Sequence, residues 1–141
     1  LRVERQQSDH ILARKIEQEG VEAFISFWEN IPLFETQKQL PAKRQAKLRN
    51  ERQNQQAVGL ANSLRMMGTG KMPEMWHQVA SLPMQTTLIT GELDTKFINI
   101  ANAMQQENKS IHHITVPSVG HAIHVENLQK FATIVKEAIS N

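Results

Sequence analysis

An acidic residue and a histidine each follow a short apolar segment in the second half of the sequence. Asp94 comes shortly after the stretch 86–90, and His121 comes shortly after the stretch 111–116. A carboxylate beside an imidazole fixes the tautomer of the ring and stabilises its cationic form, so the ring can act as a general base. Asp94 and His121 are therefore the candidate catalytic residues, and they predict proton-transfer chemistry.

Each of these residues also has an interpretation without catalysis. Asp94 stands just before a helical pattern, where aspartate commonly caps the helix, and this role is compatible with a catalytic one. A histidine in a loop is commonly a surface or structural residue. His121, His124 and Glu126 together suggest a zinc site, but the segment lacks firm ligand spacing and the sequence has no cysteine. We therefore expect no metal here.

The pattern from residue 81 onward predicts how the two residues are positioned. Two stretches are rich in β-branched or apolar residues and predict strands, and two have apolar residues at helical spacing. Strands joined by a helix should be parallel neighbours with a right-handed crossover, and parallel strands end at the same edge of a sheet. We therefore expect Asp94 and His121 to lie close together. The expected order is strand 86–90, helix 96–106, strand 111–116 and helix 125–140.

Residues 1–80 show apolar residues at helical spacing and predict a helical lid. Ser8 and Asp9 are placed to cap the first helix, and Gly20 is placed to end it. Residues 32–34 are expected to form a turn. The expected helices are 5–19, 21–29, 41–54, 58–67 and 73–81.

An acid after one strand and a histidine after the next is the order of the α/β-hydrolase fold. Two parallel strands leave unpaired edges, so further strands must come from elsewhere, and an exposed edge could also pair two copies. The nucleophile of such enzymes is a serine in a G-x-S-x-G frame, which no serine in this sequence has. We expect the carboxyl-terminal part of an α/β-hydrolase, with 81–141 in its core. The partner of this chain would be the amino-terminal half of the enzyme, which carries the serine. Without that half, this chain would be inactive.

Two motifs make the comparison more specific. The segments GELDTKF at 91–97 and GHAIHVE at 120–126 resemble the acid and histidine motifs of the 2-succinyl-6-hydroxy-2,4-cyclohexadiene-1-carboxylate synthase family. Segments 5–9, 27–34 and 48–49 are also similar to that family, so the resemblance spans nearly the whole chain. It implies a carbon-oxygen lyase of menaquinone biosynthesis that uses a Ser-Asp-His triad and neither a metal nor an organic cofactor. The family eliminates pyruvate from 2-succinyl-5-enolpyruvyl-6-hydroxy-3-cyclohexene-1-carboxylate.

The resemblance also implies which residues bind this small carboxylated substrate. Arg5 and Arg49 match arginines of the family's lid, and Trp28 matches an aromatic residue of its pocket. Arginine suits the task because its planar fork donates two parallel hydrogen bonds to a carboxylate. Arg65 is a weaker candidate. From the residues alone, solvated arginines and a core position for Trp28 explain the pattern equally well.

Two other functions fit the same residues. A generic α/β-hydrolase, such as an esterase or a carbon-carbon bond hydrolase, shares Asp94 and His121 but needs no paired lid arginines. A non-enzymatic helical binding module would use Asp94 only as a cap and His121 only as a structural residue.

The composition excludes several classes of protein. The net charge is +2, and the basic residues are interspersed with acidic ones, so we expect no nucleic-acid partner. The apolar runs are too short for a membrane span, and we expect no membrane insertion. Without cysteines or a leader-like pattern, the predicted location is the cytoplasm.

Overall fold

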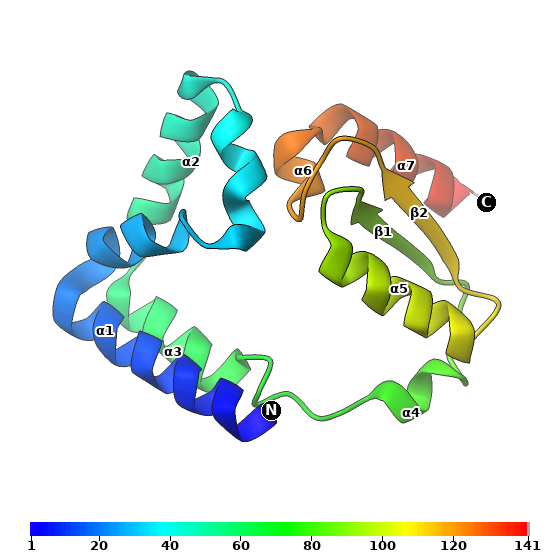
Figure 1. Ribbon diagram of the computed structural model, residues 1–141, viewed down its shortest axis with the longest axis horizontal. Coiled ribbons are helices and arrows are strands. Elements are labelled where there is room, and N and C mark those ends of the chain that lie inside the picture. The colour runs from blue at the N-terminus through cyan, green and yellow to red at the C-terminus, as the bar shows by residue number, and fades with distance from the viewer. Residues whose placement is uncertain (141) are drawn as a thin grey trace. The chain divides into compact units, whose positions relative to one another are not determined.

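The computed structural model describes residues 1–140, which divide into two compact units (Figure 1). The helical unit comprises Leu1–Ile31 and Pro41–Glu74, and the strand unit comprises Pro32–Leu40 and the chain from Met75 on. Within the described residues, no helix combines the length and apolar character that a membrane crossing requires. The predicted division into a helical lid at 1–80 and a hydrolase core at 81–141 assigns functional roles to the two regions, and it stays a prediction.

The helical unit is built on α1, Arg2–Trp28, which is interrupted at Gly20. Gly20 has φ 84° and ψ 173°, a left-handed backbone that a residue with a Cβ atom rarely adopts. The two helices expected at 5–19 and 21–29 are therefore the two arms of α1.

α1 packs along α3, Ala57–Met67, and this contact forms the core of the helical unit. Ile16, Phe24 and Ile25 are buried there. Partly buried apolar residues surround them: Leu12, Val21, Trp28, Ala57, Leu60 and Leu64. The remaining helix of the helical unit, α2, Ala42–Gln53, has no buried residue, which agrees with its polar sequence.

The expected cap at Ser8 and Asp9 is wrong. α1 begins at Arg2, so Asp9 lies inside the helix, where its side chain is buried. Contacts made by the side chains of Arg2 and Gln6 stabilise the additional residues at the start of α1, before the expected first residue, Arg5. Gln6 Nε2 donates to the carbonyl of Gly70 at 2.7 Å, and Arg2 donates to the carbonyl of Met72. These bonds tie the first turns of α1 to the segment after α3.

The strand unit contains two parallel strands, β1, Thr87–Gly91, and β2, His112–Val116. They are joined by α5, Thr95–Glu107, as the apolar pattern predicts. The register runs from Thr87 opposite His112 to Gly91 opposite Val116, so both strands end at the same edge. The strand-helix-strand prediction is confirmed.

The helix expected at 125–140 is two helices. α6, Ile123–Glu126, and α7, Leu128–Ser140, are separated by Asn127, whose φ of −143° and ψ of 73° are not helical. Asn127 Oδ1 accepts from the backbone N–H of Lys130 at 3.1 Å, so Asn127 caps α7 and starts a new helix.

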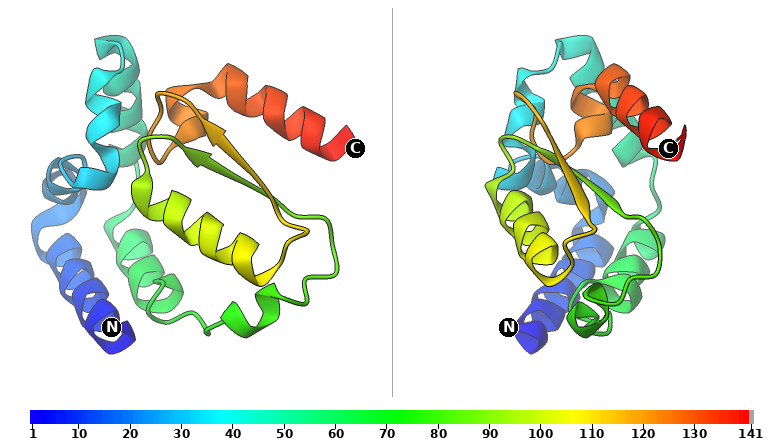
Figure 2. Two further views of the ribbon diagram at one scale, coloured as in Figure 1. Left: turned by 45° about the vertical axis from the view of Figure 1, so that its right-hand side comes forward. Right: turned by 90° about the vertical axis from the view of Figure 1, so that its right-hand side faces the viewer.

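α5 and α7 cover opposite faces of the two strands (Figure 2). On the α7 side, Ile134 joins a buried cluster with Val116, Val119 and Ile123. This cluster anchors the segment that follows β2.

The turn expected at 32–34 is wrong, because Pro32–Gln39 forms a 3-10 helix, η1. η1 lies between α1 and α2 in the sequence, yet it packs within the strand unit. The hydroxyl of Thr36 donates to Glu126 Oε1 at 2.9 Å, a contact between residues 90 positions apart. The short helix predicted at 73–81 is α4, Trp76–Val79.

Candidate functional site

Asp94 and His121 form a hydrogen-bonded pair at the ends of β1 and β2. His121 Nδ1 lies 2.7 Å from Asp94 Oδ2. The Asp94 side chain is 6% exposed and the His121 side chain 32%, so the carboxylate is screened while the ring is accessible. Asp94 Oδ1 also accepts from the backbone N–H of Phe97 at 3.3 Å and caps α5. The Asp94 carboxylate thus both pairs with His121 and caps a helix, which are the two roles that the sequence suggested.

The pair fixes the tautomer of the imidazole. An ionised carboxylate can only accept hydrogen bonds, so Nδ1 carries a proton and donates a hydrogen bond to Asp94. The lone pair is then on Nε2, the atom that can accept a proton. The ring of Phe97 has its centroid 4.6 Å from that of His121, and Phe34 of η1 is at 6.4 Å. These aromatic neighbours restrict how the imidazole can turn.

The loop that carries His121 is fixed against the end of β1. The backbone N–H of Glu92 donates to the carbonyl of Val116 at 2.8 Å, and that of Leu93 donates to the carbonyl of Val119 at 3.0 Å. A Cβ atom on Gly91 would overlap the carbonyl oxygens of Val119 and Gly120, so the close approach requires glycine at position 91.

Glu92 contributes a second restraint on this loop. Its Oε2 accepts from the backbone N–H of Ser118 at 2.7 Å. Ser118 has a φ of 60°, a left-handed conformation that is unfavourable for serine. The bond to Glu92 helps to hold this strained backbone in place.

The carboxylate of Glu126 holds the loop from its other side. Oε2 accepts from the backbone N–H of Gly120 at 2.7 Å, while Oε1 accepts from Thr36. The sequence suggested Glu126 as a metal ligand and as the end of the histidine motif at 120–126, and it did not suggest Thr36 at all. Among the described residues, no group of three or more His, Cys, Asp or Glu side chains could hold a metal ion.

The predicted substrate-binding residues lie in the helical unit, whereas Asp94 and His121 lie in the strand unit. Arg5 Nε donates to the buried Asp9 Oδ1 at 2.9 Å. Within the described residues, the Arg5 side chain has no other hydrogen bond or ion pair, so its two terminal nitrogens are free. Asp9 Oδ2 is buried and without a hydrogen-bond partner in the same part of the chain.

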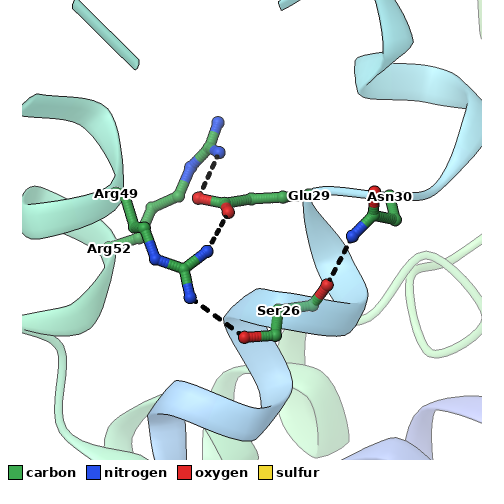
Figure 3. A network of polar contacts seen from close by, with 5 residues as sticks. All are labelled: Ser26, Glu29, Asn30, Arg49 and Arg52. Carbon is green, nitrogen blue, oxygen red and sulfur yellow. Dashed lines mark hydrogen bonds and ion pairs between the residues drawn. The ribbon is translucent and has the colours of Figure 1, made fainter. Parts of the chain in front are cut away.

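Arg49 belongs to a network of polar contacts that also contains Ser26, Glu29 and Arg52 (Figure 3). Its Nη1 lies 2.5 Å from Glu29 Oε2, and its Nη2 donates to Ser26 Oγ at 3.0 Å. Glu29 Oε1 also accepts from Arg52 Nη1 at 3.3 Å. Glu29 thus lies between two arginines, and both terminal nitrogens of Arg49 have partners.

Trp28 and Arg65 have structural partners in the helical unit. The ring centroid of Trp28 is 5.3 Å from that of Phe24, and Trp28 lines a largely apolar cavity of about 230 Å³ together with Arg52. Arg65 makes two hydrogen bonds of 2.6 Å to the carboxylate of Glu17. This bidentate contact lowers the pKa of Glu17 below its ordinary value and raises that of Arg65.

Parallel strands flanked by helices, with an acid and a histidine at the strand ends, define part of an α/β-hydrolase fold. The solved structure of a thermophilic esterase from Thermogutta terrifontis, with malate bound, has this fold. It matches 97% of this chain and 50% of its own with a TM-score of 0.79 and 17% identity. The predicted fold class is confirmed.

More specific similarity comes from two other proteins. MenH from S. aureus matches 99% of this chain and 52% of its own, with a TM-score of 0.94 and 32% identity. A Bacillus subtilis (strain 168) protein provisionally named 2-succinyl-6-hydroxy-2,4-cyclohexadiene-1-carboxylate synthase is 39% identical over 140 residues. That alignment covers 99% of this chain and 51% of the relative. The resemblance predicted from the motifs is confirmed.

The chain spans about half the length of each of these three proteins. No protein-family model matches the sequence.

Proposed function

We propose that the protein containing this chain is a lyase of menaquinone biosynthesis that converts 2-succinyl-5-enolpyruvyl-6-hydroxy-3-cyclohexene-1-carboxylate to 2-succinyl-6-hydroxy-2,4-cyclohexadiene-1-carboxylate and pyruvate. The observation that carries the choice of reaction is the 39% identity to a relative named for it. The 2.7 Å contact between Asp94 and His121 supports proton-transfer catalysis, which other α/β-hydrolases share. We place the reaction in the cytoplasm, as the composition predicts.

In this proposal His121 is the base that drives the elimination. Nε2 takes the proton of a serine hydroxyl, and the activated serine removes a proton from the substrate ring. The electron pair of the broken C–H bond forms a ring double bond as the bond between the ring and the enolpyruvyl oxygen breaks. The imidazolium of His121 gives its proton to the departing enolpyruvate, which becomes pyruvate. Asp94 stabilises the imidazolium that forms during the transfer. We assign the serine to the part of the full-length protein that corresponds to the other half of its relatives.

We assign the binding of substrate carboxylates to Arg5 and Arg49, and contact with the remainder of the substrate to Trp28. Arg5 can offer both terminal nitrogens without breaking a contact within the described residues. Arg49 would have to exchange its bond to Glu29 for one to the substrate. Binding through Arg5 therefore costs less reorganisation, and we expect Arg5 to contribute more to affinity.

Pyruvate release by the full-length protein tests the reaction. We expect pyruvate to form with the cyclohexene substrate, and the His121→Ala variant to lose this activity. Turnover of simple esters without pyruvate release would contradict the lyase and favour a generic hydrolase. Undiminished pyruvate release by the His121→Ala variant would contradict the role of His121 as the base, and a wild-type protein that turns over neither substrate would favour the non-enzymatic binding module.

Alanine substitutions test the carboxylate-binding role. Arg5→Ala should raise KM by about 10- to 100-fold, the equivalent of one or two charge-assisted hydrogen bonds, and Arg49→Ala should raise it less. Arg14→Ala is the matched control, because Arg14 is an exposed arginine on the same helix. An Arg5→Ala variant with the KM of the Arg14→Ala variant would refute the assignment of Arg5.

A further inference from the structure

Glu126 joins α6 to the loop that precedes it and to η1, which lies 90 positions away in the sequence. Its Oε1 accepts from Thr36 of η1 at 2.9 Å, and its Oε2 accepts from the backbone N–H of Gly120 at 2.7 Å. Glu126 itself is the last residue of α6. Gly120 directly precedes His121, so the carboxylate binds the peptide that leads into the proposed base.

Both bonds of Glu126 matter to the backbone at Gly120. Gly120 is buried, and a buried N–H without an acceptor costs about 1–3 kcal/mol, so loss of Glu126 would favour a rearranged loop. Thr36 packs against the same residue, since a Cβ atom on Gly120 would overlap the Thr36 side chain. Thr36 therefore contacts Gly120 directly and also fixes the carboxylate that holds it.

The imidazole of His121 depends on this backbone for its position. Asp94 restrains only the Nδ1 side of the ring, and the left-handed Ser118 lies two residues before Gly120. A shift of the peptide at Gly120 would move the Cα atom of His121 and redirect Nε2, even with the contact to Asp94 in place. A displacement of 1 Å at a reacting group can cost about 10²-fold in rate.

We propose that Glu126 is a positioning residue for His121, and that Thr36 fixes the Glu126 carboxylate in its working orientation. This inference rests on the proposed function, which makes His121 the base. It predicts a loss in kcat with little change in KM, because neither Glu126 nor Thr36 is assigned to substrate binding.

Two matched pairs of variants in the full-length protein test the proposal. Glu126→Ala removes both hydrogen bonds, whereas Glu126→Gln can accept from Gly120 and donate to the Thr36 hydroxyl. Thr36→Val removes one hydroxyl at nearly constant volume, and Thr36→Ser retains it. We expect kcat to fall by about 10²-fold in Glu126→Ala and by about 10-fold in Thr36→Val, with KM within about twofold of wild type. Glu126→Gln and Thr36→Ser should restore most of the activity.

A spectroscopic readout makes the test independent of the reaction. The Nδ1 proton of His121 is hydrogen-bonded to Asp94 and should give a downfield proton resonance, assigned by its absence in His121→Ala. We expect this resonance to shift or broaden in Glu126→Ala and Thr36→Val, and to stay at its wild-type position in the two conservative variants.

Unchanged kcat or an unchanged resonance in Glu126→Ala would overturn the proposal, even where the free energy of unfolding falls. If Glu126→Ala does not fold, an unchanged kcat or an unchanged resonance in Thr36→Val would overturn the proposal. A wild-type protein that releases no pyruvate contradicts the proposed lyase alone, and the resonance then tests the positioning role by itself.

Discussion

The carboxylate of Asp94 has two separable contacts, one to the backbone of α5 and one to the proposed base. Serine is also a good N-cap, so Asp94→Ser should keep the bond to Phe97 while removing the partner of His121 Nδ1. We expect the free energy of unfolding to change by less than about 1 kcal/mol and kcat to fall by roughly 10²–10⁴-fold. Chemical denaturation and pyruvate-release kinetics on the full-length protein measure the two effects.

Asp94→Ala supplies the comparison, because it removes both contacts. It should lose as much kcat as Asp94→Ser and about 1 kcal/mol more stability. Wild-type kcat in Asp94→Ser would show that the carboxylate serves only as a cap.

The bidentate contact between Glu17 and Arg65 links α1 to α3 and makes the stability of the helical unit depend on pH. The hydrogen bond from Arg65 lowers the pKa of Glu17 in the folded protein below its ordinary value of 4.5. The unfolded chain then binds the proton more readily, so the stabilisation is present above pH 4.5 and is lost as the pH falls through the lower, folded-state pKa. Glu17→Gln should therefore lower stability at neutral pH but not in acid.

Denaturant unfolding at neutral and acidic pH measures this difference, with Glu19→Gln as the control. Glu19 lies on the same helix, and its side chain forms an exposed ion pair with Lys15 at 3.8 Å. An equal pH dependence of the two variants would contradict a specific role for the Glu17–Arg65 contact.

At the scale of the helix, two glycines near α3 should respond to alanine with opposite signs. Gly59 is exposed within α3, and a Cβ atom there would meet only Gln56 Cβ at 3.9 Å, so Gly59→Ala should stabilise by about 0.5–1 kcal/mol. A Cβ atom on Gly68 would overlap the carbonyl of Leu64 and the buried Asp9 carboxylate, so Gly68→Ala should destabilise by about 1–3 kcal/mol. Thermal unfolding of the two variants checks the signs, and stabilisation by Gly68→Ala would contradict this packing.

The elements that the sequence pattern predicted well are those with a local signal. β1, α5 and β2 follow from apolar periodicity, and the rule that parallel strands end at one edge correctly brought Asp94 and His121 together. Asn127 carried a readable cap signal, but the apolar pattern that runs across it concealed the break. The contact between Thr36 and Glu126 had no local signal, because it depends on two segments that only the fold brings together.

At the scale of the whole molecule, the two strands make an incomplete sheet within the described residues. Large apolar side chains, including Met84, Leu93 and Leu128, are more than half exposed. We expect a protein of residues 1–141 alone to bind an apolar dye and to unfold without a sharp transition. The full-length protein should bind no such dye and should unfold cooperatively. Cooperative unfolding of residues 1–141 without dye binding would show that this half is an independent domain.

The path of the chain limits how this protein can be recombined with its relatives. Because η1 belongs to the strand unit, the helical unit consists of two separate stretches of sequence, Leu1–Ile31 and Pro41–Glu74. A chimera that exchanged the first 74 residues as one block would also import a foreign segment at Thr36. Exchange of the helical unit, to which we assign substrate binding, therefore needs a crossover on each side of 32–40, so that the host keeps the η1 that matches its own histidine loop.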